Sequence, residues 1–252
     1  MFRVIIIQNP YRLMNSYRSI VTGLQVRLKL PHRIRRMNKE NYQKKLDEIL
    51  KDPDIKGKRL FLHCCCAPCS SYVLLYLSEY LKITAFYYNP NITDDNEYKK
   101  RVAEEKRLID EYNKSGRAVY PIDFVEGDHD PDVFFEAVKG HEDDKEGGDR
   151  CRICFALRLS EAARLASEGG YDYFTTTLTI SPLKDADALN TIGIAAGERY
   201  NVAFLPSDFK KRDGYKTSIE LSKEYDLYRQ DYCGCIYSLK ERQVEKNNER
   251  TG

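Results

Sequence analysis

Residues 59–81 read RLFLHCCCAPCSSYVLLYLSEYL, and this stretch decides the fold. Its first five residues, 59–63, form a short apolar run with the length and composition of a buried strand. Residues 70–81 are apolar over several turns and predict a buried helix. The strand therefore passes into the helix through a short loop that carries four cysteines. A strand followed closely by a helix is the repeating unit of a parallel sheet.

The same alternation continues along the chain. Further strands are predicted at residues 83–88, 118–122, 171–176 and 202–205, and further helices at residues 41–51, 94–114, 155–167, 186–200 and 218–228. This order predicts an α/β fold of the Rossmann-like (HUP-like) kind. We expect an open, mostly parallel sheet with helices on both faces, followed by a helical C-terminal part.

The composition is that of a globular protein with a substantial core. Of the 252 residues, 32% are charged and 42% are hydrophobic. No apolar run approaches the ~20 residues that a membrane span needs, so no membrane partner is expected. Vicinal cysteines are poor disulfide staples in a chain of this size, which favours a reducing compartment, the cytoplasm.

The N-terminal segment differs from the rest in charge. Residues 1–36 hold eight Lys or Arg and no Asp or Glu, which is typical of a targeting peptide or a nucleic-acid-binding arm. Because Met37 opens directly onto a helical pattern, we favour an upstream extension of the reading frame with Met37 as the natural start. Residues 37–252 then carry 33 basic and 39 acidic side chains and are expected to form a single α/β domain.

The cysteines are the candidates for chemistry. They form three tight clusters, namely Cys64, Cys65, Cys66 and Cys69; Cys151 and Cys154; and Cys233 and Cys235. Packing alone would scatter cysteines singly through apolar runs, because a free cysteine behaves as a small buried hydrophobe. The first cluster lies between a strand and a helix, where exposed N–H groups and the helix dipole stabilise thiolates. Clustering therefore favours metal binding or catalysis.

The second and third clusters suggest different roles. Cys151 and Cys154 are three residues apart at a predicted helix start, so both sulfurs can face the same way. With two thiolates from the first loop they would complete a four-sulfur site, which suits either zinc or an iron–sulfur cluster. Cys233 and Cys235 would close too small a loop for a stabilising disulfide, so we favour a redox-active pair, with two more metal ligands as the alternative. His63 ends a buried strand and is expected to be a core histidine.

Five segments together resemble a known family. They are HCCCAPCS (63–70), YNPN (88–91), CRIC (151–154), TTTLTISP (175–182) and YRQDYCGCIYS (228–238). In this order they are similar to the motifs of the cobalamin-independent epoxyqueuosine reductases, the QueH family. The resemblance runs from about Arg59 to Ser238. The family's first motif carries two adjacent cysteines where this chain has three, and the family lacks the basic segment 1–36.

The resemblance implies the last step of queuosine synthesis in tRNA. The epoxide of epoxyqueuosine, at the wobble position of the anticodon, would be reduced to the alkene with two electrons and two protons. The resemblance also implies a ligand set for a [4Fe–4S] cluster, made of Cys65, Cys66, Cys151 and Cys154. Cys233 and Cys235 would be the redox-active pair. Cys69, together with Cys64, is left to bind an additional metal, such as a mononuclear iron, or to support the ligands.

The implied partners are a tRNA and an electron donor that the sequence does not identify. Because residues 37–252 are formally acidic, a polyanion requires a local concentration of positive charge. The candidates for tRNA binding are Lys210, Lys211, Arg212, Lys216 and Arg229. The alternative for this segment is a solvated surface loop.

Two functions from other classes remain open. The first is a zinc-stabilised RNA-binding module without redox chemistry. The second is a thiol–disulfide oxidoreductase whose active pair is Cys66 and Cys69 in the sequence Cys-Ala-Pro-Cys.

Overall fold

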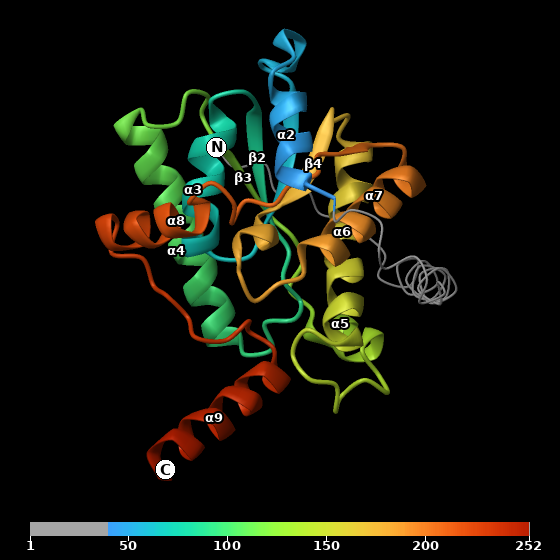
Figure 1. Ribbon diagram of the computed structural model, residues 1–252, viewed down its shortest axis with the longest axis vertical. Helices are drawn as coiled ribbons and strands as arrows, with labels where there is room; N and C mark the ends of the chain where they lie inside the picture. Colours follow the sequence, from blue (N-terminus) through green and yellow to red (C-terminus); the bar gives the residue numbers. More distant parts are fainter. Residues whose placement is uncertain (1–39, 252) are drawn as a thin grey trace.

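The computed structural model describes residues 40–251, so the basic segment 1–36 and the start expected at Met37 lie outside the described residues. One parallel sheet with the strand order β3-β2-β1-β4-β5 lies at its centre (Figure 1). Its strands are β1 (Arg59–Cys64), β2 (Lys82–Tyr87), β3 (Asp123–Glu126), β4 (Tyr173–Thr176) and β5 (Ala203–Phe204). The order turns back at β1, which is the Rossmann-like arrangement, and the predicted α/β fold is confirmed.

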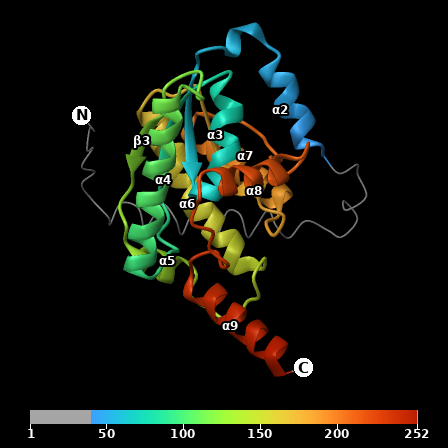
Figure 2. The same ribbon diagram turned by 90° about the vertical axis from the view of Figure 1, so that its left-hand side faces the viewer.

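Helices cover both faces of the sheet (Figures 1 and 2). They are α2 (Tyr42–Leu50), α3 (Ala67–Ser78), α4 (Asp95–Ser115), α5 (Pro131–Ala137), α6 (Asp149–Glu168), α7 (Ala186–Tyr200), α8 (Gly214–Glu224) and α9 (Ile236–Thr251), with the 3-10 turns η2 (Pro53–Ile55) and η3 (Thr177–Ile180). In both views α9 extends away from the layered body, in agreement with the predicted helical C-terminal part. Within residues 40–251, no helix combines the length and apolar character that crossing a membrane requires.

The pleat of β1 divides the core into two parts. Leu60 and Leu62 point to one face and pack with Leu74 of α3, whereas Phe61 points to the other face and packs with Ala162 of α6. All five side chains are buried. Burying a Leu or Phe side chain contributes about 1.5–3 kcal/mol relative to leaving it exposed. The continuous apolar run that predicted β1 is thus explained by helices on both sides.

The boundaries of the long helices follow from their caps. The Asp94 side chain accepts a hydrogen bond from the Glu97 N–H at the start of α4, and Gly116 ends that helix with a φ of +68°. The Asp185 side chain accepts from the Asp187 N–H in the same way at the start of α7. Both helices lie within one residue of the predicted ranges 94–114 and 186–200.

One predicted strand is wrong. Residues 118–120 form a bend and residues 121–122 have no regular structure, and β3 begins only at Asp123, opposite Thr84 of β2. The physical reason is the Asn113 side chain, whose amide bonds both the N–H and the carbonyl of Ile122 at 2.9 Å. Ile122 therefore pairs with a side chain instead of a neighbouring strand, and Pro121 has no N–H to offer a ladder. The short helix α5 was not predicted either.

Candidate active site

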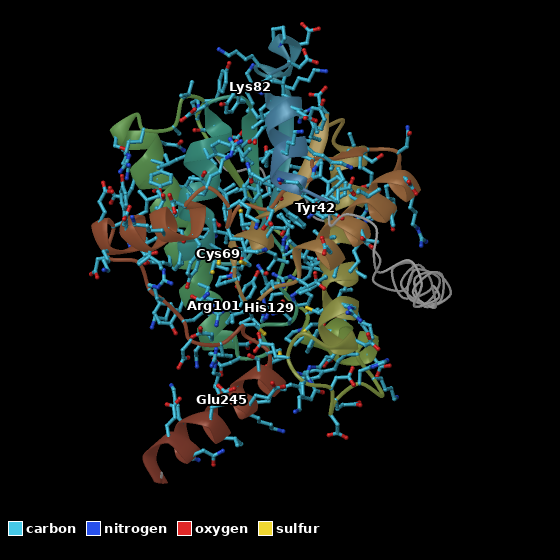
Figure 3. The ribbon with its side chains drawn as sticks, in the orientation of Figure 1. Tyr42, Cys69, Lys82, Arg101, His129 and Glu245 are labelled. Atoms are coloured by element: carbon cyan, nitrogen blue, oxygen red, sulfur yellow. The ribbon has the colours of Figure 1, made fainter. Side chains whose placement is uncertain are left out.

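A cavity lies at the carboxyl ends of β1 and β4, where the strand order turns back and open parallel sheets bind ligands. It has a volume of about 140 Å³, and its wall includes Cys65, Cys66, Cys69, Cys151, Cys154, Cys233 and Cys235. Thr177, just after β4, donates a hydrogen bond from Oγ1 to the Cys65 sulfur at 3.6 Å. Figure 3 shows Cys69 and Arg101, both in the cavity wall, far from Lys82 at the start of β2.

The sulfurs of the first cysteine cluster point in two directions. Cys64 is the last residue of β1, fully buried in the core beneath α3, and its thiol donates to the Leu62 carbonyl at 3.5 Å. The sulfurs of Cys65, Cys66 and Cys69 instead lie within 4.8 Å of one another at the cavity. These three thiols could hold a metal ion. Strand alternation leaves Cys64 outside that group.

The pKa values of the three grouped thiols are shifted in opposite directions. The pKa of Cys65 lies well below its usual range because Cys66 and Cys69 donate hydrogen bonds to its thiolate, although burial opposes the shift. The pKa values of Cys66 and Cys69 are raised, first by those same hydrogen bonds to Cys65. Cys65 is therefore the one of the three that most readily becomes a thiolate, and metal binding would release the protons of the others.

The second cluster lies on the first two turns of α6. Cys151 and Cys154 both reach the cavity wall, and the Gly147 N–H donates to the Cys151 sulfur at 3.2 Å. Burial raises the pKa of Cys154 to about 11 and also raises that of Cys151. The predicted helix start is confirmed, and it brings this pair to the same cavity as Cys65. Neither sulfur belongs to the group that lies within 4.8 Å.

The third cluster forms a tight turn before α9. The sulfurs of Cys233 and Cys235 lie 3.5 Å apart. Gly234 between them has a φ of +112°, and a Cβ there would lie 2.7 Å from Cγ1 of Ile92. Only glycine fits this turn without strain, because an L side chain would disfavour the backbone angle and clash with Ile92.

Residues that follow β2 donate hydrogen bonds to the backbone carbonyl groups of this turn. The Arg101 guanidinium donates to the Cys233 carbonyl at 3.2 Å, and the Asn91 side-chain amide donates to the same oxygen at 3.4 Å. The Thr93 N–H donates to the Gly234 carbonyl at 3.2 Å. The two sulfurs are thereby positioned by α4 and the loop that leads into it.

Charge at the turn favours one thiolate. The pKa of Cys233 lies well below its usual range, first because of its hydrogen bond with Cys235 and also because Lys184 adds positive charge, although burial opposes the shift. The pKa of Cys235 is raised, first by the same hydrogen bond and then by burial. Burial alone would lower the pKa of Lys184, but the Cys233 thiolate and Glu146 raise it. The Lys184 ammonium lies 4.0 Å from the Glu146 carboxylate.

The comparisons with known proteins point to one family. The family model of epoxyqueuosine reductase QueH matches residues 60–241, which contain all eight cysteines. A protein named epoxyqueuosine reductase QueH from Streptococcus pyogenes is 42% identical, covering 80% of this chain and 79% of that protein. Proteins of the same name from Staphylococcus epidermidis and Thermotoga maritima are 39% and 34% identical, covering 82% and 75% of this chain and 88% and 94% of those proteins.

The chain belongs to the QueH family. Three features of this QueH protein were not predicted from its sequence, namely the buried arginines Arg101, Arg150 and Arg158 in the cavity wall. Arg158 follows Cys154 by four residues, so helical spacing could have placed it beside that sulfur. No local pattern identified Arg101. His63 is a buried core histidine, as predicted, and its Nδ1 lies 2.8 Å from Thr176 Oγ1.

The basic residues predicted to bind tRNA lie apart from the cavity wall described above. None of Lys210, Lys211, Arg212, Lys216 and Arg229 is among the described residues that line it. Lys210 forms an ion pair with Asp208 at 2.7 Å, and Arg212 forms one with Asp47. Their role in RNA binding stays a prediction.

Proposed function

We propose that this chain is an epoxyqueuosine reductase that converts the epoxide of epoxyqueuosine in tRNA to the alkene of queuosine. The observation that carries the proposal is the convergence of seven cysteines, from three distant segments, on one cavity of a QueH-family chain. The curated relatives with the name epoxyqueuosine reductase support the same activity.

Oxidation of the Cys233 and Cys235 thiols supplies the electrons and protons that the reaction consumes. Two thiols that join in a disulfide release two electrons and two protons. An epoxide that becomes an alkene takes up two electrons and two protons and releases its oxygen as water. The 3.5 Å separation of the two sulfurs supports this role, since a small movement brings them to bonding distance. An external electron donor then restores the dithiol.

The cavity suits a thiolate-bound metal cofactor. All its cysteines are free thiols, and sulfur donors of this kind suit iron–sulfur clusters and zinc. In our proposal Cys65, Cys66, Cys151 and Cys154 hold a [4Fe–4S] cluster. When bound, such a cluster supplies single electrons and an iron that can polarise a C–O bond. Cys69, beside Cys65 and Cys66, is available for an additional iron or as an alternative ligand.

The substrate must reach the cavity from an anticodon loop. A wobble base can enter only if it leaves the stack, as single-stranded RNA bases do when proteins bind them. Asp231 and Tyr232 lie at the cavity wall immediately before the Cys233 turn. A base held there would carry its modified ring toward the sulfurs. We infer that the basic segment 210–216 contacts more distant phosphates.

Anaerobic iron and sulfide analysis of a cysteine series tests the proposal. Changing Cys66 or Cys151 to Ala is expected to reduce bound iron sharply and abolish turnover. Changing Cys233 to Ser is expected to leave iron bound and abolish turnover. Cys64→Ala is the matched control, because Cys64 lies in the same loop with its sulfur in the core. Full iron content in Cys151→Ala would remove that residue from the ligand set.

The same series distinguishes the two alternatives. A colourless protein that holds only zinc after anaerobic preparation would indicate an RNA-binding module. Disulfide reduction that survives the loss of Cys151 and Cys154 would indicate a thiol–disulfide oxidoreductase that uses Cys66 and Cys69. The family membership favours neither of these.

A further inference from the structure

Arg158 carries a buried positive charge beside the proposed cluster ligands. Its side chain projects from α6 into the cavity wall, and the residue is only 3% exposed. Nη1 donates to the Cys154 sulfur at 3.9 Å, Nε donates to Nε2 of His63 at 3.3 Å, and Nη2 donates to Oδ1 of Asn89. The guanidinium thus joins α6 to β1 and to the segment that follows β2.

No carboxylate balances this charge among the described residues. The other buried arginines of the cavity wall are paired, Arg101 with Glu97 at 2.7 Å and Arg150 with Glu241 at 2.8 Å. Within residues 40–251 no ion pair of Arg158 is found, and the oxygen that it contacts belongs to a neutral amide.

A buried cation without an anion is costly, so its counter-charge must come from the cavity. The groups at hand are cysteine sulfurs, since the Cys154 sulfur lies 3.9 Å from Nη1 of Arg158 and Cys65 lines the same cavity wall. A cluster held by four thiolates is anionic and becomes more so on reduction. Net charge and hydrogen bonds to sulfur are known determinants of such reduction potentials.

We propose that Arg158 is the buried counter-charge of the cysteine-held cluster, and that it raises the cluster's reduction potential by stabilising the reduced form. This inference rests on the proposed function. Arg158 is a positioning residue, because it acts on the cluster through a ligand and not on the substrate. Asn89 belongs to the same arrangement, since its amide nitrogen donates to the Cys64 carbonyl at 2.9 Å while its oxygen accepts from Arg158.

The test is an anaerobic redox titration of the purified holoenzyme, followed by optical and electron paramagnetic resonance spectra. Arg158→Gln removes the charge, and we expect at least a tenfold lower ratio of reduced to oxidised cluster at the wild-type midpoint. For a one-electron couple a tenfold change is about 59 mV. Arg158→Lys keeps the charge and should recover most of the ratio.

A second variant neutralises the charge of the guanidinium without removing it. Asn89→Asp places a carboxylate against Arg158, so the pair is neutral and the ratio of reduced to oxidised cluster should also fall. Arg164→Gln is the matched control on the same helix, because Arg164 is already paired with Glu161 and Glu168 at 2.7 Å and should leave the ratio unchanged. If Arg158→Gln binds less iron than wild type, Asn89→Asp decides the question.

Unshifted midpoints in iron-loaded Arg158→Gln or Asn89→Asp would overturn the inference and leave the proposed function standing. A midpoint shift of equal size in Arg164→Gln would also overturn the inference, because loss of any positive charge on α6 would then have the same effect. A wild-type protein that binds neither iron nor sulfide would refute the proposed cofactor, and this inference with it.

Discussion

Replacing Gly234 by Ala should damage the dithiol turn while leaving the metal ligands in place. Gly234 has a φ of +112°, which an L residue adopts at a cost of about 1–3 kcal/mol. The added Cβ would also lie 2.7 Å from Ile92 Cγ1 and 3.2 Å from Arg101 Nη1. Overpacking of this kind costs typically 1–3 kcal/mol. The two terms together predict a loss of about 2–6 kcal/mol in the free energy of unfolding.

Urea unfolding of metal-loaded protein measures that loss. Gly116→Ala is the control for backbone strain alone, because Gly116 has a φ of +68° and no atom within 4 Å of an added Cβ. The difference between the two variants reports the contacts that the added Cβ makes with Ile92 and Arg101. We also expect Gly234→Ala to keep its iron and to form the Cys233–Cys235 disulfide more slowly. If both variants lose the same free energy, or if Gly234→Ala reduces its substrate normally, the reasoning about the turn is wrong.

Three further predictions concern charge. Burial raises the pKa of Glu105 from 4.5 to about 8, so the folded protein holds a proton that the unfolded chain releases, and stability should fall as the pH rises from about 4.5 to 8. Glu105→Gln should flatten that fall, and urea unfolding at pH 5 and pH 8 would detect it. Lys184→Gln should raise the pKa of Cys233, seen as slower alkylation of metal-free protein at neutral pH; an unchanged rate would exclude the ammonium as a cause. Neutralising the three cations of residues 210–212 should weaken tRNA binding and reduce the slope of log affinity against log salt by about one unit per lost phosphate contact, whereas unaltered binding would make this segment a solvated loop.

Local patterns in the sequence were sufficient for most of the elements. The alternation of strands and helices predicted the parallel sheet, because each element must bury an apolar face against its neighbours. Helix α7 was predicted to the residue from its periodicity. The exception at residues 118–122 arose because the side chain of Asn113, five residues before that segment begins, captured the backbone of Ile122. Secondary-structure propensities of single residues do not account for a hydrogen bond of that kind.

The candidate site also combines features that the sequence predicted with features that only the tertiary structure decided. The three cysteine clusters and their order were enough for the family, since spacing within a cluster is a local property. Three arrangements depended on tertiary structure, namely the direction of each sulfur, the clamp on the Cys233 turn and the unbalanced charge of Arg158. Cys64 and Cys65 are adjacent in sequence, yet the pleat of β1 buries one in the core and leaves the other at the cavity. Arg101 reaches the turn from more than 100 residues away. Contacts between distant segments exist only after the chain has folded, so the sequence alone determined which groups are candidates for the chemistry, and the tertiary structure decided which of them meet.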